Sequence, residues 1–326
     1  RGGAGGAGGA GGGAQGPTLE VVPTPTAVAG ALAGAPPPLG PGQRELEDVQ
    51  YRAVACGGSN SFMLTTEGEV HLLGGLWPPG GDTGAVRHVW GNLRGGPPSR
   101  VARIAAGWRH CLLLTEAGRV FALGDDEHGQ CAGANTGAAA IPLPSRAPAA
   151  GVAAGACHSV AWDCGGRAFA WGHGGNGRLG LGKVQHKRSP APVCLPEDEA
   201  VCSACCGSNF TLFATASRTS LGLTPGAAPP ARGPPTALWS CGGNQYGQLG
   251  VGGDAASSRE VPVRTGHPRP GDELVGLACG AYHALSITRA LPKASQVAPS
   301  RGARDGRPVV WAWGCAASGQ CGGRDR

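Results

Sequence analysis

The segment AAGACHSVAWDCGGRAFAWGHGGNGRLG, residues Ala153–Gly180, decides the fold. It opens with small residues and an anchor glycine, Gly155, which is followed three positions later by His158. Two short apolar stretches then meet at Gly166, and the second of them runs into a glycine cluster that starts at Gly172. Apolar runs this short, punctuated by glycine, are typical of strands joined by tight turns, because a helix needs about 10 to 12 residues of 3.6 periodicity.

The same arrangement recurs along the chain. Five segments align with one another: ACGGSNSFML from Ala55, AAGWRHCLLL from Ala105, AAGACHSVAW from Ala153, ACCGSNFTLF from Ala204 and ACGAYHALSI from Ala278. The third residue of each is the predicted anchor, which gives Gly57, Gly107, Gly155, Cys206 and Gly280. Three residues after the anchors stand His110, His158 and His283, with Asn60 and Asn209 in the other two repeats. Internal repeats of this length indicate an array of similar structural units.

A second set of glycines follows each pair of apolar stretches. The spacing G-x-x-x-x-G-x-x-G occurs three times, at Gly172, Gly177 and Gly180, at Gly242, Gly247 and Gly250, and at Gly314, Gly319 and Gly322. Ala132 interrupts the same spacing in the second repeat, and the first repeat is degenerate. Each repeat therefore predicts at least three strands, the last of which ends in a glycine-rich turn.

Two further details concern the strands themselves. Gly68, Gly118 and Gly166 stand where two apolar stretches meet, which predicts hairpin turns with a positive φ. A fourth strand in each unit is indicated by the runs IPLP from Ile141, APVCLP from Ala191 and VPV from Val261. Because proline cannot donate to a strand ladder, these runs are expected at sheet edges.

Four short strands repeated about every 50 residues predict an all-β chain of the β-propeller class, with five detectable repeats. The clusters LGDDEHGQCAG from Leu123, WGHGGNGRLGLG from Trp171, CGGNQYGQLGVGG from Cys241 and WGCAASGQCGG from Trp313, together with the G-x-x-H anchors, resemble the regulator-of-chromosome-condensation repeat family. The resemblance covers residues 51–326. It implies a propeller that generally has seven blades, so we expect this sequence to be a partial chain.

The chain divides by composition. Gly, Ala and Pro dominate residues 1–50, which predicts a disordered segment because such residues bury too little apolar surface to offset the entropy of ordering. The propeller repeats are expected over 51–326, with insertions at about 217–236 and 289–307 between the same two strands of successive repeats. The second insertion is rich in arginine and is interpreted as a solvated loop.

Charge and cysteine content limit the partners. The net charge of +6 is small and dispersed, so it gives no ground for a nucleic acid or chromatin partner. No apolar run reaches the 18 to 20 residues, roughly, of a membrane span, and we expect no membrane partner. The thirteen cysteines are an odd number in a chain this long, which favours a reduced protein of the cytoplasm or nucleus.

Several motifs that suggest chemistry have a simpler interpretation within the repeats. GHGGNG, Gly172–Gly177, matches a dinucleotide-binding fingerprint, but the glycines and prolines that follow exclude the required helix. CSACC, Cys202–Cys206, supplies half of a zinc site without a second ligand pair, and Cys205 aligns with small residues of other repeats. We therefore predict no catalytic residue, no cofactor and no metal.

The remaining prediction concerns a binding surface. His110, His158 and His283 recur in step with the repeats, so we expect each to tie its anchor turn to an adjoining strand. Trp108 and Arg109 of GWRH break the repeat, and these residue types are frequent interface hot spots. They are the predicted interaction residues, and packing between blades is the alternative role for Trp108.

The family resemblance implies three functional classes. We favour a non-enzymatic scaffold for protein partners, with guanine-nucleotide exchange on a Ran-like small GTPase as the alternative. A third class is an ultraviolet-B sensor, because GWRH also occurs in the plant photoreceptor of this family, which uses clustered tryptophans. A lone Trp108 at this position cannot supply such a cluster.

Overall fold

The structure is a computed structural model that describes residues 49–74, 87–90, 100–134, 139–219, 234–252, 257–266, 268–269, 272–290 and 307–322. The chain divides into two units between Val49 and Gln50, and all described residues except Val49 belong to the second. Residues 1–48 of the predicted disordered segment and most of both predicted insertions lie outside the described residues. The described part contains no α-helix; besides strands it has one 3₁₀ turn, η4, at Gly175–Gly177.

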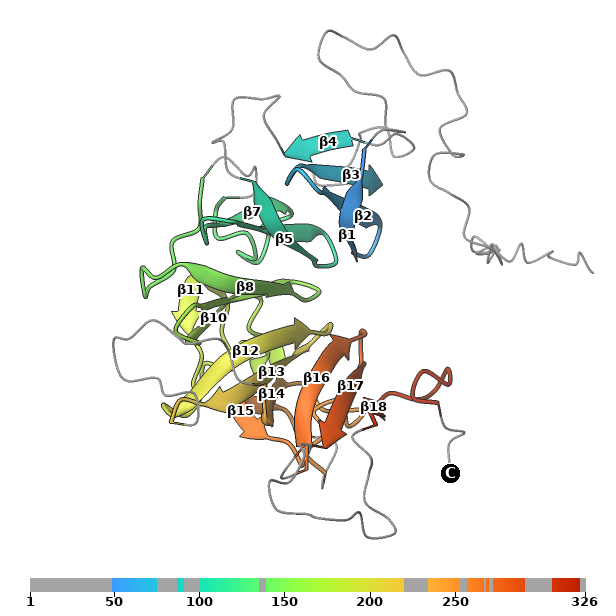
Figure 1. The fold of residues 1–326 in the computed structure, drawn as a ribbon. Coiled ribbons are helices and arrows are strands. Elements are labelled where there is room, and N and C mark those ends of the chain that lie inside the picture. Colours follow the sequence, from blue (N-terminus) through green and yellow to red (C-terminus); the bar gives the residue numbers. More distant parts are fainter. Residues whose placement is uncertain are drawn as a thin grey trace, which may run out of the picture. The chain divides into compact units, whose positions relative to one another are not determined.

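The strands form five separate antiparallel sheets, as the repeats predict (Figure 1). The first contains β1 (Tyr51–Cys56), β2 (Asn60–Thr65), β3 (Val70–Gly74) and β4 (Arg87–Trp90). The second contains β5 (Val101–Ala106), β6 (His110–Thr115) and β7 (Val120–Gly124). The third contains β8 (Ala149–Ala154), β9 (His158–Asp163), β10 (Ala168–Gly172) and β11 (Lys187–Pro192). The fourth contains β12 (Glu199–Cys206), β13 (Phe210–Ser217), β14 (Ala237–Gly242) and β15 (Arg259–Arg264). The fifth contains β16 (Asp272–Cys279), β17 (His283–Ala290) and β18 (Val309–Gly314).

The structure confirms one of the three predicted fourth strands, shifts the bounds of another and contradicts the third. The run VPV from Val261 lies within β15, at a sheet edge, as expected. The run from Ala191 starts near the end of the observed edge strand, because β11 spans Lys187–Pro192. The run from Ile141 is wrong as a strand, since its pairing is a single bridge between Ile141 and Val120. The first repeat has a fourth strand, β4, that no pattern indicated.

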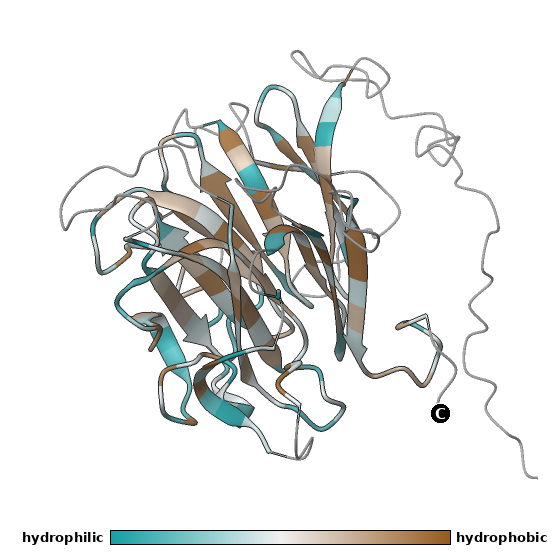
Figure 2. Cartoon of the chain, turned by 60° about the horizontal axis from the view of Figure 1, so that its bottom comes forward, coloured by the Kyte–Doolittle hydropathy of each residue, from teal (hydrophilic) through white to brown (hydrophobic). Residues whose placement is uncertain are grey.

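Each interior sheet buries both of its faces. In β6 the alternate residues Cys111 and Leu113 pack against the first sheet, whereas Leu112 and Leu114 pack against the third. Side chains on a strand alternate between faces, so a strand covered on both sides reads as the unbroken apolar run seen here. Figure 2 shows the resulting concentration of hydrophobic residues along the strands, while hydrophilic residues gather in the connections.

Glycine supplies the turns that these short strands need. Gly68, Gly118 and Gly166 have φ values of 82°, 72° and 76°, which confirms the predicted positive φ at the hairpins. Ala132, which replaces glycine in the second repeat, adopts a φ of 54° and so keeps the left-handed conformation of its glycine counterparts. Glycine recurs at these turns because the backbone there adopts a positive φ, which other residues rarely adopt.

Candidate functional site: the anchor face

The anchor turns of the five sheets are joined by backbone hydrogen bonds. The Gly58 N–H donates to the Trp108 carbonyl at 3.0 Å, and the Trp108 N–H is shared between the carbonyls of Gly155 and Ala156, both at 3.3 Å. Further along, the Ser208 N–H donates to the Ala281 carbonyl at 2.9 Å. The turns of successive repeats thus lie side by side at one end of the sheets.

The anchor glycines are needed because these turns approach so closely. A Cβ atom on Gly107 would lie 2.4 Å from the Gly155 carbonyl oxygen, and one on Gly155 would lie 2.6 Å from the Gly207 carbonyl oxygen. The same Cβ atoms would lie 2.2 Å and 2.1 Å from the Cε1 atoms of His110 and His158. Any side chain at these anchors would therefore collide both with the ring three residues on and with the next repeat.

This contact corrects the predicted register of the fourth repeat by one residue. The anchor is Gly207 rather than Cys206, since the Gly207 N–H donates to the Phe210 carbonyl at 2.9 Å as Gly155 does to His158. Phe210, not Asn209, holds the position of the histidines, and its Cε1 would lie 2.0 Å from a Cβ on Gly207. The shared requirement is a flat side chain lying over the anchor glycine.

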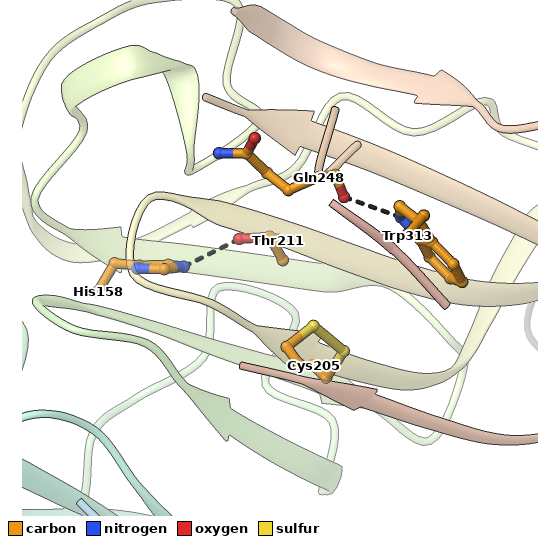
Figure 3. Close-up of a disulfide and its surroundings, with 6 residues drawn as sticks. His158, Cys205, Thr211, Gln248 and Trp313 are labelled. Carbon is orange, nitrogen blue, oxygen red and sulfur yellow. Dashed lines mark hydrogen bonds between the residues drawn. A yellow bond between two sulfur atoms is a disulfide. The ribbon is translucent and has the colours of Figure 1, made fainter. Parts of the chain in front are cut away.

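Two of the recurring histidines link neighbouring sheets. His110 Nε2 lies 2.9 Å from Ser159 Oγ, and Ser159 Oγ in turn donates to the Gln130 carbonyl at 2.7 Å. His158 makes the equivalent contact with Thr211 Oγ1 at 2.9 Å, drawn in Figure 3. Because the hydroxyl proton is used by a carbonyl in both cases, the imidazole Nε2–H is the donor. His283, the third recurring histidine, lies at the start of β17 and is half-buried.

Burial keeps these two imidazoles neutral. Both side chains are fully buried, and desolvation lowers the pKa of His110 to about 4, with Asp125 opposing the shift. Desolvation also lowers the pKa of His158 well below its ordinary value, and Arg178 adds to this effect. Neutral rings with a defined donor suit a structural link between repeats.

Each glycine-rich loop is tied back to an anchor turn. The N–H groups of Asp125, His173, Gly243 and Cys315 donate to the carbonyls of Arg109, Cys157, Asn209 and Tyr282, at 2.9, 2.8, 2.8 and 2.8 Å. The anchor turns and these loops therefore share one end of the sheets, which we call the anchor face. It comprises the turns 57–59, 107–109, 155–157, 207–209 and 280–282 and the loops 125–134, 173–186, 243–252 and 315–322.

The predicted interaction residues lie on this face. Trp108 is 57% exposed, and a Cβ on Gly58 would lie 2.7 Å from its ring, so the indole lies over the turn of the preceding repeat. Arg109, the next residue, is also exposed. Sequence reasoning missed two further aromatic residues of the face, Tyr246 and Tyr282, whose rings meet edge to face at 5.3 Å while both stay exposed.

A disulfide was also missed (Figure 3). Cys205 of β12 and Cys279 of β16 are joined across two sheets, with their Cα atoms 5.8 Å apart. This corrects the expectation of a fully reduced chain and the interpretation of Cys205 as a small apolar residue. The other eleven cysteines form no disulfide.

The structure also bears on the motifs that suggested chemistry. GHGGNG ends in the short turn η4, Gly175–Gly177, and the next element is the strand β11 rather than an α-helix, in agreement with its interpretation as repeat sequence. In CSACC, Cys205 is bonded to Cys279, and burial raises the pKa of Cys206 to about 12. The Cys205 sulfur is therefore held in a disulfide rather than available to bind a metal.

Comparison with known proteins identifies the repeats. The family described as regulator of chromosome condensation (RCC1) repeat matches residues 165–214 and 237–287, and a second profile of the same description matches residues 101–130. The chain therefore contains RCC1 repeats. These matches cover the whole of the second sheet, β10 and β11 of the third, most of the fourth and much of β16 and β17 in the fifth. Together with the likeness to solved RCC1 structures, they show that the five sheets are blades of an RCC1-type β-propeller.

Similar proteins with RCC1 repeats differ in what they do. The chain is 30% identical over 227 residues to the human protein named probable E3 ubiquitin-protein ligase HERC3, covering 68% of this chain and 18% of HERC3. It is 26% identical over 177 residues to the ultraviolet-B receptor UVR8 of Arabidopsis thaliana, covering 52% of this chain and 40% of UVR8. The chain thus spans less than half the length of either relative.

Among solved structures, Prp20p from Saccharomyces cerevisiae superposes with a TM-score of 0.57 at 18% identity, covering 75% of this chain and 58% of Prp20p. Prp20p itself binds Gsp1p and histones. At this identity the likeness concerns the RCC1 propeller fold alone. No helix in the described residues is long and apolar enough to cross a membrane.

Proposed function

We propose that the chain is a non-enzymatic scaffold that binds a protein partner through the anchor face. The observation that carries this proposal is Trp108, a large apolar side chain 57% exposed beside the exposed Arg109. Trp, Tyr and Arg are the residue types that most often supply binding energy at protein interfaces. Tyr246 and Tyr282 add two exposed aromatic side chains to the anchor face, in the fourth and fifth repeats.

The scaffold is tested by proximity labelling in cells with Trp108→Ala and Arg109→Ala. Val54→Ala is a suitable control, because Val54 is 71% exposed but lies in β1, outside the anchor face. We expect the face variants to lose partners that the control keeps, while all three retain the wild-type melting temperature. An unchanged partner set in the face variants would refute this face as the binding surface.

Guanine-nucleotide exchange is the second candidate, supported by the likeness of the fold to Prp20p, which binds Gsp1p. It is distinguished from a pure scaffold by release of labelled guanine nucleotide from a panel of small GTPases. The scaffold proposal expects no acceleration. Accelerated release from any one GTPase would replace it with exchange activity.

An ultraviolet-B sensor is not proposed. The positions equivalent to Trp108 are Gly58, Ala156, Ser208 and Ala281, so the anchor turns of the other four repeats contribute no tryptophan there.

We also propose a cytoplasmic or nuclear location, which is supported by eleven of the thirteen cysteines remaining outside disulfides. A chromatin partner is not part of this proposal. The Cys205–Cys279 bond would be open to reduction in such a compartment. Imaging of the tagged full chain tests this location directly, and secretion into the medium would contradict it.

A further inference from the structure

Three histidines from two different repeats meet on the anchor face. His128 lies in the loop after β7, His173 follows β10 directly, and His186 immediately precedes β11. One ring nitrogen from each lies within 4.8 Å of the others. The sequence predicted no metal site, because His128 lies in a different loop from His173 and His186 and the three residues share no ligand-spacing motif.

The backbone is shaped to bring these loops together. The Arg188 guanidinium donates to the Glu127 carbonyl at 3.1 Å, next to His128. Gly129 has a φ of 81°, and a Cβ there would lie 2.7 Å from Arg188 Cγ. A Cβ on Gly174 would lie 1.8 Å from the Gln185 carbonyl oxygen. Glycines therefore allow the segment before β11 to contact both loops, which places His186 beside His128 and His173.

The three rings are in mutual contact and two of them are held by the backbone. The ring centroids are 4.7 Å apart for His128 and His173, 4.4 Å for His173 and His186, and 5.5 Å for His128 and His186. The Gly175 N–H donates to His173 Nδ1 at 3.1 Å, and the Gly174 N–H donates to His186 Nδ1 at 3.2 Å. The arrangement is thus a built cluster with its imidazoles fixed by the loop 173–175.

We propose that His128, His173 and His186 together bind one Zn²⁺ ion, which clamps the loop after β7 to the loop after β10. Zinc takes imidazole nitrogen at about 2.0 to 2.1 Å in tetrahedral geometry, so the three nitrogens of a bound site lie roughly 3.3 Å apart. Side-chain rotation supplies the contraction from the present separation, most easily at the exposed His186. Three protein ligands leave the fourth position for water.

Zinc binding changes two hydrogen bonds of the loop. With backbone N–H groups donating to Nδ1, the neutral rings of His173 and His186 carry their proton on Nε2. Coordination through Nε2 moves that proton to Nδ1 and ends both backbone contacts. The amides of Gly174 and Gly175 are therefore specific reporters of the bound state.

The test is equilibrium dialysis of the metal-free full chain against Zn²⁺, followed by elemental analysis. We expect one equivalent of zinc, a higher melting temperature with zinc, and shifts of the Gly174 and Gly175 amide resonances. His173→Gln and His186→Gln should each weaken binding by more than about tenfold, since loss of an outer-shell partner alone costs that much. His283→Asn is the matched control, because it removes a histidine outside the cluster at a position where Asn60 stands in the first repeat.

Cobalt distinguishes histidine ligands from the free cysteines. Co²⁺ bound at this cluster should show no thiolate-to-metal charge-transfer absorption. Such an absorption, or zinc binding that survives in both glutamine variants, would assign the metal to cysteine and overturn the proposal. Absence of zinc binding by the wild-type chain would overturn it equally. His186→Gln should melt like the wild type without zinc, so a failure to fold cannot mimic loss of the site.

Discussion

The anchor position shows what a single residue contributes to this fold. His110 and His158 lie over their glycines and reach a hydroxyl of the next sheet at 2.9 Å, whereas Phe210 keeps only the flat ring over Gly207. Shape is therefore the part of the role that all three share, and the hydrogen bond is added where the neighbouring sheet offers Ser159 or Thr211. The sequence showed the recurring histidines but not this distinction, because ACCGSNFTLF aligns equally well with Asn209 or Phe210 in the histidine column.

Replacement of His158 tests the hydrogen bond. His158→Ala removes the donor to Thr211 Oγ1 and leaves a cavity beside Gly155, so the free energy of unfolding should fall by about 1–3 kcal/mol. His158→Asn should lose less, because the flat amide still fills part of the space over Gly155, as Asn60 does over Gly57 in the first repeat. Thermal melts of the two variants check this. Midpoints that both equal the wild-type value would refute a structural role.

The same buried rings make stability depend on pH. The unfolded chain protonates His110 near pH 6.5, whereas the folded chain does not until about pH 4, so the unfolded state binds more protons in this window. The free energy of unfolding should therefore fall as pH drops below 6.5, by up to about 1.4 kcal/mol per pH unit for each such histidine. Denaturant unfolding of wild type and His110→Asn at several pH values measures this. Equal slopes for the two proteins would contradict the assignment.

At the scale of the strands, periodic features were predictable and contacts between distant repeats were not. The hairpin at Gly166 and the edge strand around Pro262 follow from local sequence, since glycine and proline act on their own backbone. The strand predicted from the IPLP run is absent, because proline and apolar residues do not by themselves supply a partner strand. Ile141 pairs with Val120 through a single bridge. The Cys205–Cys279 bond depends on which strands the stacked sheets bring together, and the histidine cluster depends on which loops they bring together. No local pattern encodes either contact.

The disulfide should stabilise the contact between β12 and β16. It closes a separation of 74 residues, for which the loss of chain entropy in the unfolded state amounts to about 4 kcal/mol. A thiol reductant should therefore lower the denaturant midpoint of the wild type. Without reductant, Cys205→Ser should already have the lower denaturant midpoint of the reduced wild type. Adding reductant should not change the midpoint of this variant. A wild-type midpoint that reductant leaves unchanged would mean that the bond adds no stability.

At the scale of the whole molecule, each sheet contacts its neighbours in sequence, through β1 and β5, β5 and β8, β8 and β12, and β12 and β16. Stability of such an array is approximately a sum of repeat and nearest-neighbour terms, so a defect is felt mainly at the interface where it lies. The family and the fold could be recognised from sequence because every repeat carries the same pattern of anchor glycine, apolar strands and glycine-rich turn. The partner could not, since it depends on exposed residues such as Trp108 that depart from the repeat.

Gly155→Ala tests this locality. Its new Cβ would lie 2.6 Å from the Gly207 carbonyl oxygen, an overpacking that should cost about 1–3 kcal/mol. Gly165→Ala is the control, because the nearest atom is Asp163 Oδ1 at 3.2 Å. Hydrogen exchange should accelerate in β8–β15 of the Gly155 variant more than in β1–β3. Uniform acceleration across all sheets would show that the array unfolds as one cooperative unit.

β13 ends at Ser217 and β14 begins at Ala237, and β17 ends at Ala290 and β18 begins at Val309, all at the end of the sheets opposite the anchor face. A peptide epitope or a fluorophore inserted between either pair of strands would therefore leave and re-enter the sheet at the end away from Trp108. Protein captured on a sensor chip through such a handle would present its tryptophan end uniformly to the solution. The repeat topology therefore offers an oriented reagent for finding the partner that the sequence does not name.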